Sequence, residues 1–319
     1  MFADDDPRRP AIVGAHARSA PVAAAWRRSD EVRALAEVFD AACATDVDRA
    51  CECGVALLSD ATLVARLLTP LVETLAEDPF FEPPFKVQRD RHRIGAALFD
   101  SPAARLTAAV TRPGAAAPDT VVVPGQISVT RYHRAGGVTL SRWDAGTVAR
   151  DFTAAGASPA TRLSALAPRQ GEVVVHDGRR IGHRAAGATG AVVTVTVLLR
   201  AGMAPLMREY RTDGGALVRA ASTDDAASRG AMLRTLLRVS GRSDANPLFE
   251  AATRDAGFDT RWAAMREWLA LDAAAALPRL ASMSAADPHP DVRAAAAATL
   301  AVATLAVARQ RLPEVACPA

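Results

Sequence analysis

Three histidines are the first candidates for chemistry in this sequence. His133, His176 and His183 lie in or beside short runs of β-branched residues, and alternate side chains of such an extended run point the same way. Histidines on facing strands of a small β-barrel can therefore converge on its interior. Because neutral imidazole is a good ligand for Fe(II), Mn(II) and Zn(II), we predict that these three side chains bind Fe(II) or another divalent metal.

Two further side chains accompany the histidines. Tyr132 directly precedes His133, and Arg180 lies between His176 and His183, close to Arg179 and Arg184. A guanidinium can hold a substrate carboxylate or phosphate through two parallel hydrogen bonds. We therefore predict that Tyr132 and Arg180 are catalytic residues.

The same residues also fit a purely structural interpretation. His176 directly precedes the turn pair Asp177-Gly178 and would then be an exposed hairpin residue. His133, which lies beside Arg131 and Arg134, would then be a surface residue. Under this interpretation the β region still forms a ligand cavity, but no metal centre.

Several reaction classes are excluded by missing motifs. The only lysine, Lys86, follows no glycine-rich turn, so the chain has no P-loop for a nucleotide phosphate. Neither the dinucleotide pattern Gly-x-Gly-x-x-Gly nor the Gly-x-Ser-x-Gly nucleophile turn occurs. We therefore do not expect a Rossmann-type or α/β-hydrolase enzyme.

The four cysteines do not indicate a disulfide-stabilised protein. Cys43, Cys51, Cys53 and Cys317 are few for 319 residues, and no secretory signal precedes them. We expect a cytoplasmic protein with reduced thiols. Cys51-Glu52-Cys53 together with Cys43 could chelate a soft metal, but the spacing differs from the usual zinc patterns.

The elements that must position the candidate residues are β-strands. Between about residues 85 and 200, short β-branched runs alternate with Gly and Pro turns, for example at 127–132 and 192–199. Arg134-Ala-Gly-Gly is a hairpin turn between two such runs, since glycine reaches positive φ without steric cost. This spacing predicts an antiparallel barrel or sandwich.

One stretch of this region resembles a known family. The run from Gly171 through His176, Gly178 and Gly182 to His183 is similar to the second sequence motif of the cupins, which are small β-barrels. The resemblance implies a cupin-like barrel in which this strand supplies a metal ligand. The His-x-His pair of the first cupin motif is missing, which favours a barrel that binds ligand without catalysis.

Helical periodicity flanks the β region on both sides. Leucines at 63, 67, 71 and 75 share one helical face, and a second helical region runs from about residue 223 to 312. We therefore expect an α+β protein with a helical N-terminal cap at 1–78, a cupin-like β domain at 79–205 and a helical C-terminal region at 206–319.

The C-terminal region carries a second resemblance. The segment from Asp287-Pro288-His289-Pro290 into the alanine-rich stretch is similar to the turn and second helix of a HEAT repeat. It implies a helical surface for a peptide or protein partner, with a buried helix over residues 294–308. We interpret His289 in this turn as a structural or an exposed residue.

Composition restricts the partners. Hydrophobic residues make up 50% of the chain and the net charge is only +3. The arginines are dispersed and aromatic residues are 5%, which argues against a nucleic-acid surface. The longest uncharged run, 294–308, is too short and too weakly apolar to span a bilayer.

Two functions follow from these patterns. The first is a cupin-like, metal-dependent oxygenase or other oxidoreductase that acts on a small molecule or on a peptide presented by the helices. The alternative is a non-catalytic protein in which a degenerate cupin barrel senses a small ligand and the helical region binds a partner. The missing His-x-His pair favours the second, and the Tyr132, His133, His176 and His183 grouping favours the first.

Overall fold

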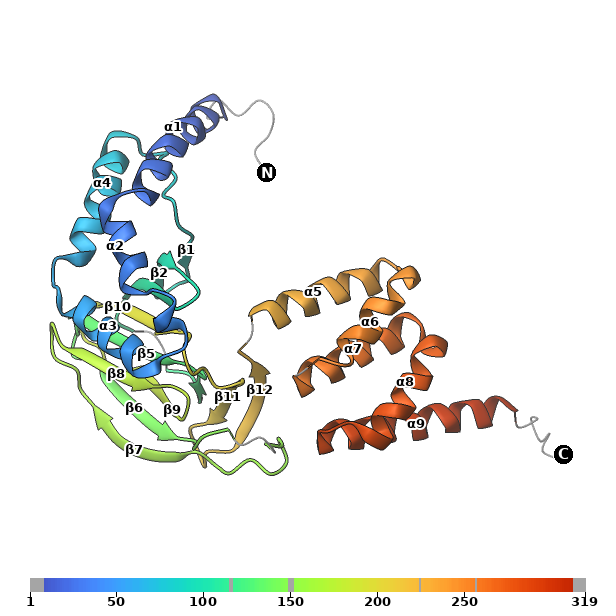
Figure 1. Ribbon diagram of the computed structural model, residues 1–319. Helices are drawn as coiled ribbons and strands as arrows, with labels where there is room; N and C mark the ends of the chain where they lie inside the picture. Colours follow the sequence, from blue (N-terminus) through green and yellow to red (C-terminus); the bar gives the residue numbers. More distant parts are fainter. Residues whose placement is uncertain (1–8, 115–116, 149–151, 224, 256, 312–319) are drawn as a thin grey trace, which may run out of the picture. The chain divides into compact units, whose positions relative to one another are not determined.

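The computed structural model describes residues 9–114, 117–148, 152–223, 225–255 and 257–311. The chain forms two compact units (Figure 1). The first comprises Met1–Thr147, Pro159–Ala204 and Arg208–Val218, and the second comprises Val148–Ser158, Pro205–Met207 and Arg219–Ala319. Strands and N-terminal helices make up the first unit, and the second is mainly helical.

The first unit begins with helices and continues with strands. Its helical elements are α1 (Arg9–Arg27), α2 (Asp30–Val38), the 3₁₀ helix η1 (Ala42–Ala44), α3 (Val47–Ser59) and α4 (Leu63–Glu77). Its strands are β1 (Val87–Arg89), β2 (Arg93–Asp100), β3 (Ala104–Thr111), β4 (Thr120–Val123), β5 (Ile127–Arg134), β6 (Thr139–Asp144), β7 (Thr161–Leu166), β8 (Val173–Asp177), β9 (Ile181–Ala186) and β10 (Val192–Leu199). Two last strands, β11 (Leu206–Arg211) and β12 (Leu217–Ser222), are divided between the two units.

The strands form three sheets. The largest has six strands in the order β1-β2-β3-β10-β5-β8, and the two smaller sheets have the orders β12-β11-β4 and β7-β6-β9. Pairing is antiparallel in the six-stranded sheet and between β6 and its neighbours β7 and β9. The predicted fold class, antiparallel sheets flanked by helices at both chain ends, is therefore confirmed.

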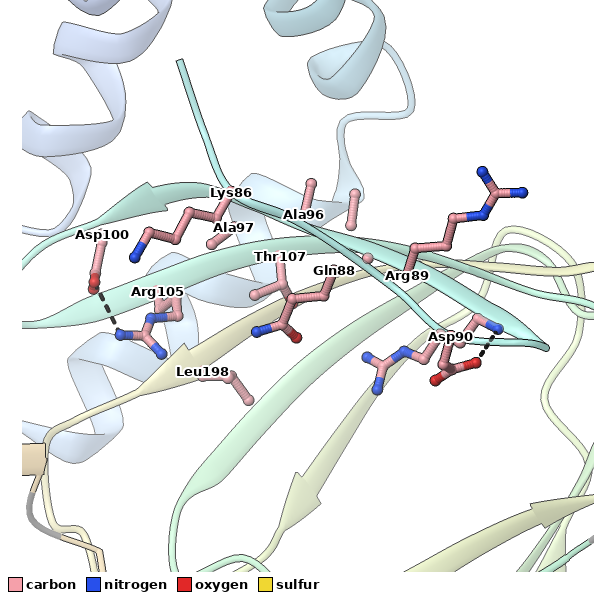
Figure 2. A pocket seen from close by; sticks show the side chains of 13 residues that line it. Lys86, Gln88, Arg89, Asp90, Ala96, Ala97, Asp100, Arg105, Thr107 and Leu198 are labelled. Atoms are coloured by element: carbon pink, nitrogen blue, oxygen red, sulfur yellow. Dashed lines mark hydrogen bonds and ion pairs between the residues drawn. The ribbon is translucent and has the colours of Figure 1, made fainter. Parts of the chain in front are cut away.

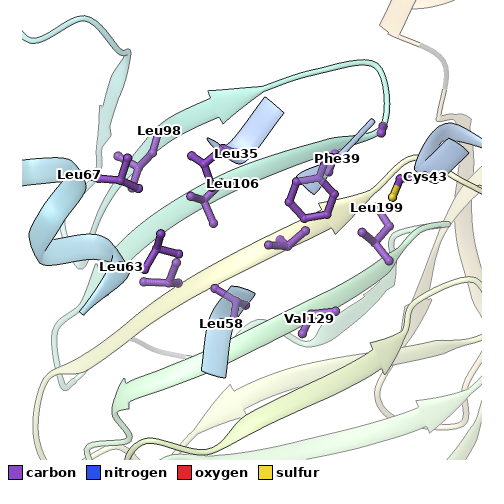
Figure 3. Close-up of a cluster of buried hydrophobic side chains, with 14 of the residues drawn as sticks. Leu35, Phe39, Cys43, Leu58, Leu63, Leu67, Leu98, Leu106, Val129 and Leu199 are labelled. Atoms are coloured by element: carbon purple, nitrogen blue, oxygen red, sulfur yellow. The ribbon is translucent and has the colours of Figure 1, made fainter. Parts of the chain in front are cut away.

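The outer face of the six-stranded sheet carries the main hydrophobic core. Leu106, Val129 and Val197 on this face pack with Leu35, Leu58 and Leu67 from α2, α3 and α4. Figure 3 shows Leu106 and Val129 together with these three leucines of the helices. Each of these side chains is at most 1% exposed. The helices therefore cover one face of the sheet, and the opposite face is not part of this core.

A glycine allows α3 to approach the sheet closely. A Cβ atom at Gly54 would lie 3.1 Å from Cγ2 of Val129 on β5. This separation is tighter than ordinary van der Waals contact, so a larger residue would push the helix away from the sheet. Because Gly54 has no side chain, α3 can lie close to the centre of the sheet.

The second unit contains the C-terminal helices. These are α5 (Asp225–Val239), the 3₁₀ helix η2 (Ser243–Ala245), α6 (Asn246–Ala252), α7 (Phe258–Leu271), α8 (Ala273–Ala286) and α9 (Pro290–Arg311). Phe249, Met265, Leu280 and Ala296 from four of the helices are completely buried in a shared cluster. The predicted helix at 294–308 lies within α9, but the expected burial is wrong for its described part, because Ala296 is the only buried side chain at 294–302. Its side chains from 303 onward are outside the described residues.

The turn before α9 is held by buried polar contacts. Arg261 forms a bidentate ion pair with Asp287, with N···O distances of 2.9 and 2.7 Å. The Nε2–H of His289 donates to the carbonyl of Phe152 at 2.9 Å, and its ring stacks on Phe258. His289 is therefore a structural residue, one of the two roles expected for it. A HEAT-type relationship for these helices stays a prediction.

The observed elements refine the sequence-based division in two places. The helices α1–α4 belong to the same compact unit as the sheets. Two strands, β11 and β12, follow residue 205, where the β domain was expected to end. Both strands belong to a smaller sheet, in which β11 pairs with β4.

Within the described residues, no single helix has the length and apolar character needed to cross a membrane. Only α3 and α4 taken together reach that length and composition, and they are bent by 61° at the break between them.

The core assignment predicts a large stability difference between two strand positions. Leu106, 1% exposed, lies under the helices, whereas Val175 on β8 is 47% exposed. We expect Leu106→Ala to lower the free energy of unfolding by about 2–5 kcal/mol, through lost burial and a residual cavity. Val175→Ala should change it by less than about 1 kcal/mol. Urea unfolding followed by circular dichroism measures both, and equal effects would contradict the assignment.

Candidate functional site

The first unit contains a partly solvent-open cavity of about 570 Å³, which we call the interior cavity because it lies on the inner face of the six-stranded sheet. It lies between the inner face of the six-stranded sheet and the sheet formed by β6, β7 and β9. Its lining combines hydroxyl, imidazole and apolar side chains with two arginines: Arg93, Ala109, Thr111, Arg112, Gly114, Pro124, Ser128, Thr130, Tyr132, Val138, Leu140, His183, Ala185, Ala186, Gly187, Ala188, Val192, Thr194, Thr196 and Leu198. The volume lies within the range of about 300–1,000 Å³ typical of small-molecule sites.

Strand alternation directs the hydroxyl groups into this cavity. Ser128 and Thr130 of β5 and Thr194 and Thr196 of β10 all line it, whereas Val129, between the two β5 residues, lies in the core under the helices. The hydroxyls of Thr130 and Thr196 are 3.0 Å apart across the strand pair. The inner face therefore offers a row of groups that can both donate and accept hydrogen bonds.

Two of the predicted histidines meet beside this cavity. His176 on β8 and His183 on β9 have stacked rings, with centroids 4.4 Å apart and planes inclined by 29°. His183 lines the cavity, and His176 is 6% exposed. The expectation that His176 is an exposed hairpin residue is thus wrong, because its strand pairs with β5 and its side chain points inward.

Two glycines of the cupin-like stretch have steric roles here. A Cβ atom at Gly182 would lie 2.7 Å from the carbonyl oxygen of Val122, and one at Gly178 would lie 2.4 Å from that of Gln126. Such contacts are far inside van der Waals distance, so both positions exclude larger residues. The glycines allow the chain to turn tightly after β8 and bring His183 back towards His176.

Arg142 completes the polar group beside the two imidazoles. It lies opposite His183 in the pairing of β6 with β9. The buried Nε2 of His176 and the buried Nε of Arg142 have no hydrogen-bond partner among the described residues. Neither of these two residues lines the cavity itself.

The environment keeps both imidazoles neutral. Burial, together with the charges of neighbouring His183 and Arg142, lowers the pKa of His176 to about 4. Burial and then Arg142 also lower the pKa of His183 below its usual value. At neutral pH each ring therefore carries one N–H donor and one nitrogen acceptor.

Tyr132 reaches the same cavity from β5. Its side chain is 4% exposed and lines the cavity. Burial, with a smaller contribution from Glu172, raises the pKa of Tyr132 to about 12. The phenol is therefore protonated at neutral pH and can donate a hydrogen bond to a bound molecule.

His133 does not join this site, and the expected three-histidine pocket is wrong. It follows Tyr132 directly on β5, and successive side chains of a strand point to opposite faces. His133 lines a separate cavity of about 710 Å³ on the outer side of the sheet, together with Val64, Leu68 and other residues of α4.

The arginines predicted to hold a substrate anion have other partners. Arg180 forms an ion pair with Asp144, and Arg179 pairs with Asp177 at 2.8 Å. Arg184 donates to the carbonyl of Pro118 and lies over the Trp143 ring. None of the three lines the interior cavity, so Arg180 stands outside the predicted site.

The donor set fits a divalent metal poorly. In the described part of the chain, no three His, Cys, Asp or Glu side chains gather as ligands would. His176 and His183 stack on each other beside the cationic Arg142, and a positive charge there opposes a dication. Cys43 and Cys53 approach each other to 3.8 Å without a third ligand, and Cys317 lies outside the described residues.

Sequence reasoning missed the hydroxyl row and Arg142. The signal was present, because Ser and Thr alternate with Val at 127–130 and 193–197. That alternation was interpreted only as a strand pattern. In a two-faced strand it also predicts that one face meets something polar.

Comparisons with known proteins find distant structural likeness but no matching family. No family model matches the sequence, and no curated protein matches it. Among solved structures, the 7S globulin of Momordica charantia is 11% identical over 41% of this chain and 36% of its own, with a TM-score of 0.26. The chain thus spans about a third of that protein.

Two further structures show a similar degree of likeness. A sugar phosphate isomerase from the cupin superfamily of Silicibacter pomeroyi is 15% identical over 40% of this chain and 74% of its own, with a TM-score of 0.24. A conserved protein of unknown function from Pseudomonas aeruginosa is 14% identical over 36% and 51%, also with a TM-score of 0.24. Structural neighbours thus include a cupin, the family that the sequence resembles, but likeness at these scores carries no inference about activity.

The buried imidazole predicts a specific pH dependence of stability. The pKa of His176 is about 4 in the folded chain, against an ordinary value of 6.5. Between these values the unfolded chain binds more protons, so the free energy of unfolding rises with pH across this window. We therefore expect the free energy of unfolding of His176→Phe, minus that of wild type, to be about 2 kcal/mol larger at pH 5 than at pH 8.

Urea unfolding at both pH values measures this difference. The control is His176→Gln, which is polar but does not titrate and should remove the same pH dependence. Wild-type and variant curves that stay parallel from pH 8 to pH 5 would contradict the burial of a neutral His176.

Proposed function

We propose that the interior cavity of the first unit binds a small, hydroxyl-bearing organic molecule. The observation that carries this proposal is the row of hydroxyls from Ser128, Thr130, Thr194 and Thr196 that lines the cavity beside Tyr132 and His183. A bound molecule would exchange hydrogen bonds with these hydroxyls, which can both donate and accept.

The lining indicates what such a molecule would look like. Hydroxyls from β5 and β10, the phenol of Tyr132 and the neutral ring of His183 all offer hydrogen bonds. Leu140, Val138 and Val192 form an apolar part of the wall together with the Tyr132 ring. The cavity therefore suits a molecule with several hydroxyl groups on one side and a hydrocarbon surface on the other.

Catalysis by this site is the second candidate. A neutral His183 can accept a proton, and a protonated Tyr132 can donate one, so the cavity holds the elements of general acid–base chemistry. A metal-dependent oxidative reaction has less support, because the two imidazoles lie beside Arg142 with no carboxylate ligand. Binding without chemical change is the simpler function and the one we propose.

A ligand panel tests the proposal on the full chain. Thermal unfolding in the presence of uncharged polyols, hydroxy acids and their phosphate esters should reveal at least one compound that raises the melting temperature. Calorimetry then measures its affinity. We expect a Thr130→Val, Thr196→Val double variant to bind about tenfold more weakly, the equivalent of one or two lost hydrogen bonds.

A matched control separates the two faces of β5. His183→Ala should weaken binding of the same compound, whereas His133→Ala, on the outer face, should leave the affinity unchanged. Equal losses in both histidine variants, or a panel with no stabilising compound, would overturn the proposal. Product analysis by NMR after incubation distinguishes binding from catalysis.

A further inference from the structure

A second cavity adjoins the interior one. Its volume is also about 570 Å³, and its lining comes from β1, β2, β3 and β10: Lys86, Gln88, Arg89, Asp90, Arg93, Gly95, Ala96, Ala97, Asp100, Arg105, Thr107, Ala108 and Leu198. Arg93 and Leu198 line both cavities. We call this second cavity the basic groove. It continues the inner face of the six-stranded sheet beyond the hydroxyl row.

Cationic side chains dominate the basic groove. Lys86, Arg89, Arg93 and Arg105 line it together with only two carboxylates. Figure 2 shows Lys86 from the chain before β1 and Arg105 from β3 extending towards the same end of the groove. Lys86 is the only lysine among 319 residues.

Both carboxylates are already engaged. Asp90 accepts hydrogen bonds from the backbone N–H groups of His92 and Arg93, at 2.8 and 2.7 Å. Asp100 accepts from Arg105 at 3.0 Å and from Arg200 at 2.6 Å. Across the described residues, neither Lys86 nor Arg89 has a carboxylate within ion-pair distance. Four cationic side chains against these two carboxylates therefore leave the groove with an excess of positive charge.

We propose that the basic groove binds the phosphate of a phosphorylated organic molecule. Clustered like charges in a concave site concentrate a positive potential that attracts an anion. The planar guanidinium of Arg93 offers a bidentate contact to phosphate oxygens, and Lys86 offers a mobile point charge. The inference rests on the proposed function, because the hydroxyl-bearing part of the same molecule would occupy the interior cavity that Arg93 and Leu198 connect to the groove.

The single lysine provides a direct probe. Reductive methylation with ¹³C-formaldehyde labels Lys86 and the chain's amino terminus and preserves their charge, and a Lys86→Arg variant assigns the lysine signal. Titration of the full chain with inorganic pyrophosphate should shift the Lys86 signal saturably. Sodium chloride at equal ionic strength should not produce saturation.

Two variants localise the binding. Arg93→Gln, inside the groove, should weaken the pyrophosphate affinity at least tenfold. Arg91→Gln removes the same charge from a neighbouring residue that does not line the groove, and it should change the affinity less than twofold. Equal losses in both variants, or a Lys86 signal that follows ionic strength alone, would overturn the proposal.

The two proposals fail separately. If the Lys86 signal does not respond to pyrophosphate while an uncharged polyol still binds through the Thr130 and Thr196 hydroxyls, only the groove proposal is wrong. If pyrophosphate binds through Arg93 while no panel compound depends on those hydroxyls, the groove proposal stands and the interior-cavity proposal fails. A phosphate ester that binds at least tenfold more tightly than its parent polyol, and loses that advantage in Lys86→Gln, supports both.

Discussion

Burial of one face of the six-stranded sheet is the constraint on which the first unit depends. The outer face presents Leu106, Val129 and Val197 to the helices α2–α4, and these side chains are almost fully buried. Because strand side chains alternate, this burial assigns every second residue to the inner face. Hydroxyls, Tyr132 and the basic groove therefore all share one continuous surface.

The charge of the side chains changes along this surface. At one end, burial keeps His176 and His183 neutral beside Arg142. At the other end, the cationic side chains of Lys86, Arg89 and Arg93 line the basic groove. The hydroxyl row of β5 and β10 lies between the two ends. A molecule with an anionic group and a hydroxyl-bearing body matches this order of chemistries.

Part of the candidate site could be predicted from local pattern. The sequence analysis placed His176 and His183 in one predicted site with His133, and the rings of the first two do stack although β8 and β9 belong to different sheets. The placement of His133 could have been corrected from the sequence alone. Tyr132 and His133 are consecutive in one strand, so both cannot enter the same cavity. Arg180 could not be placed in this way, since its partner Asp144 lies on a different strand.

Local periodicity is a short-range property, and the residue order alone contains it. The β-branched runs, the helical leucine spacing and the glycine turns therefore predicted where strands and helices form. Pairing between distant strands is a long-range property. It decided that β10 lies between β3 and β5, that the β6 sheet closes over the hydroxyl row, and that the basic groove adjoins this row. Strand pairing depends on which apolar faces can be buried together. The sequence of one segment cannot determine this, because the apolar faces that it buries belong to distant segments.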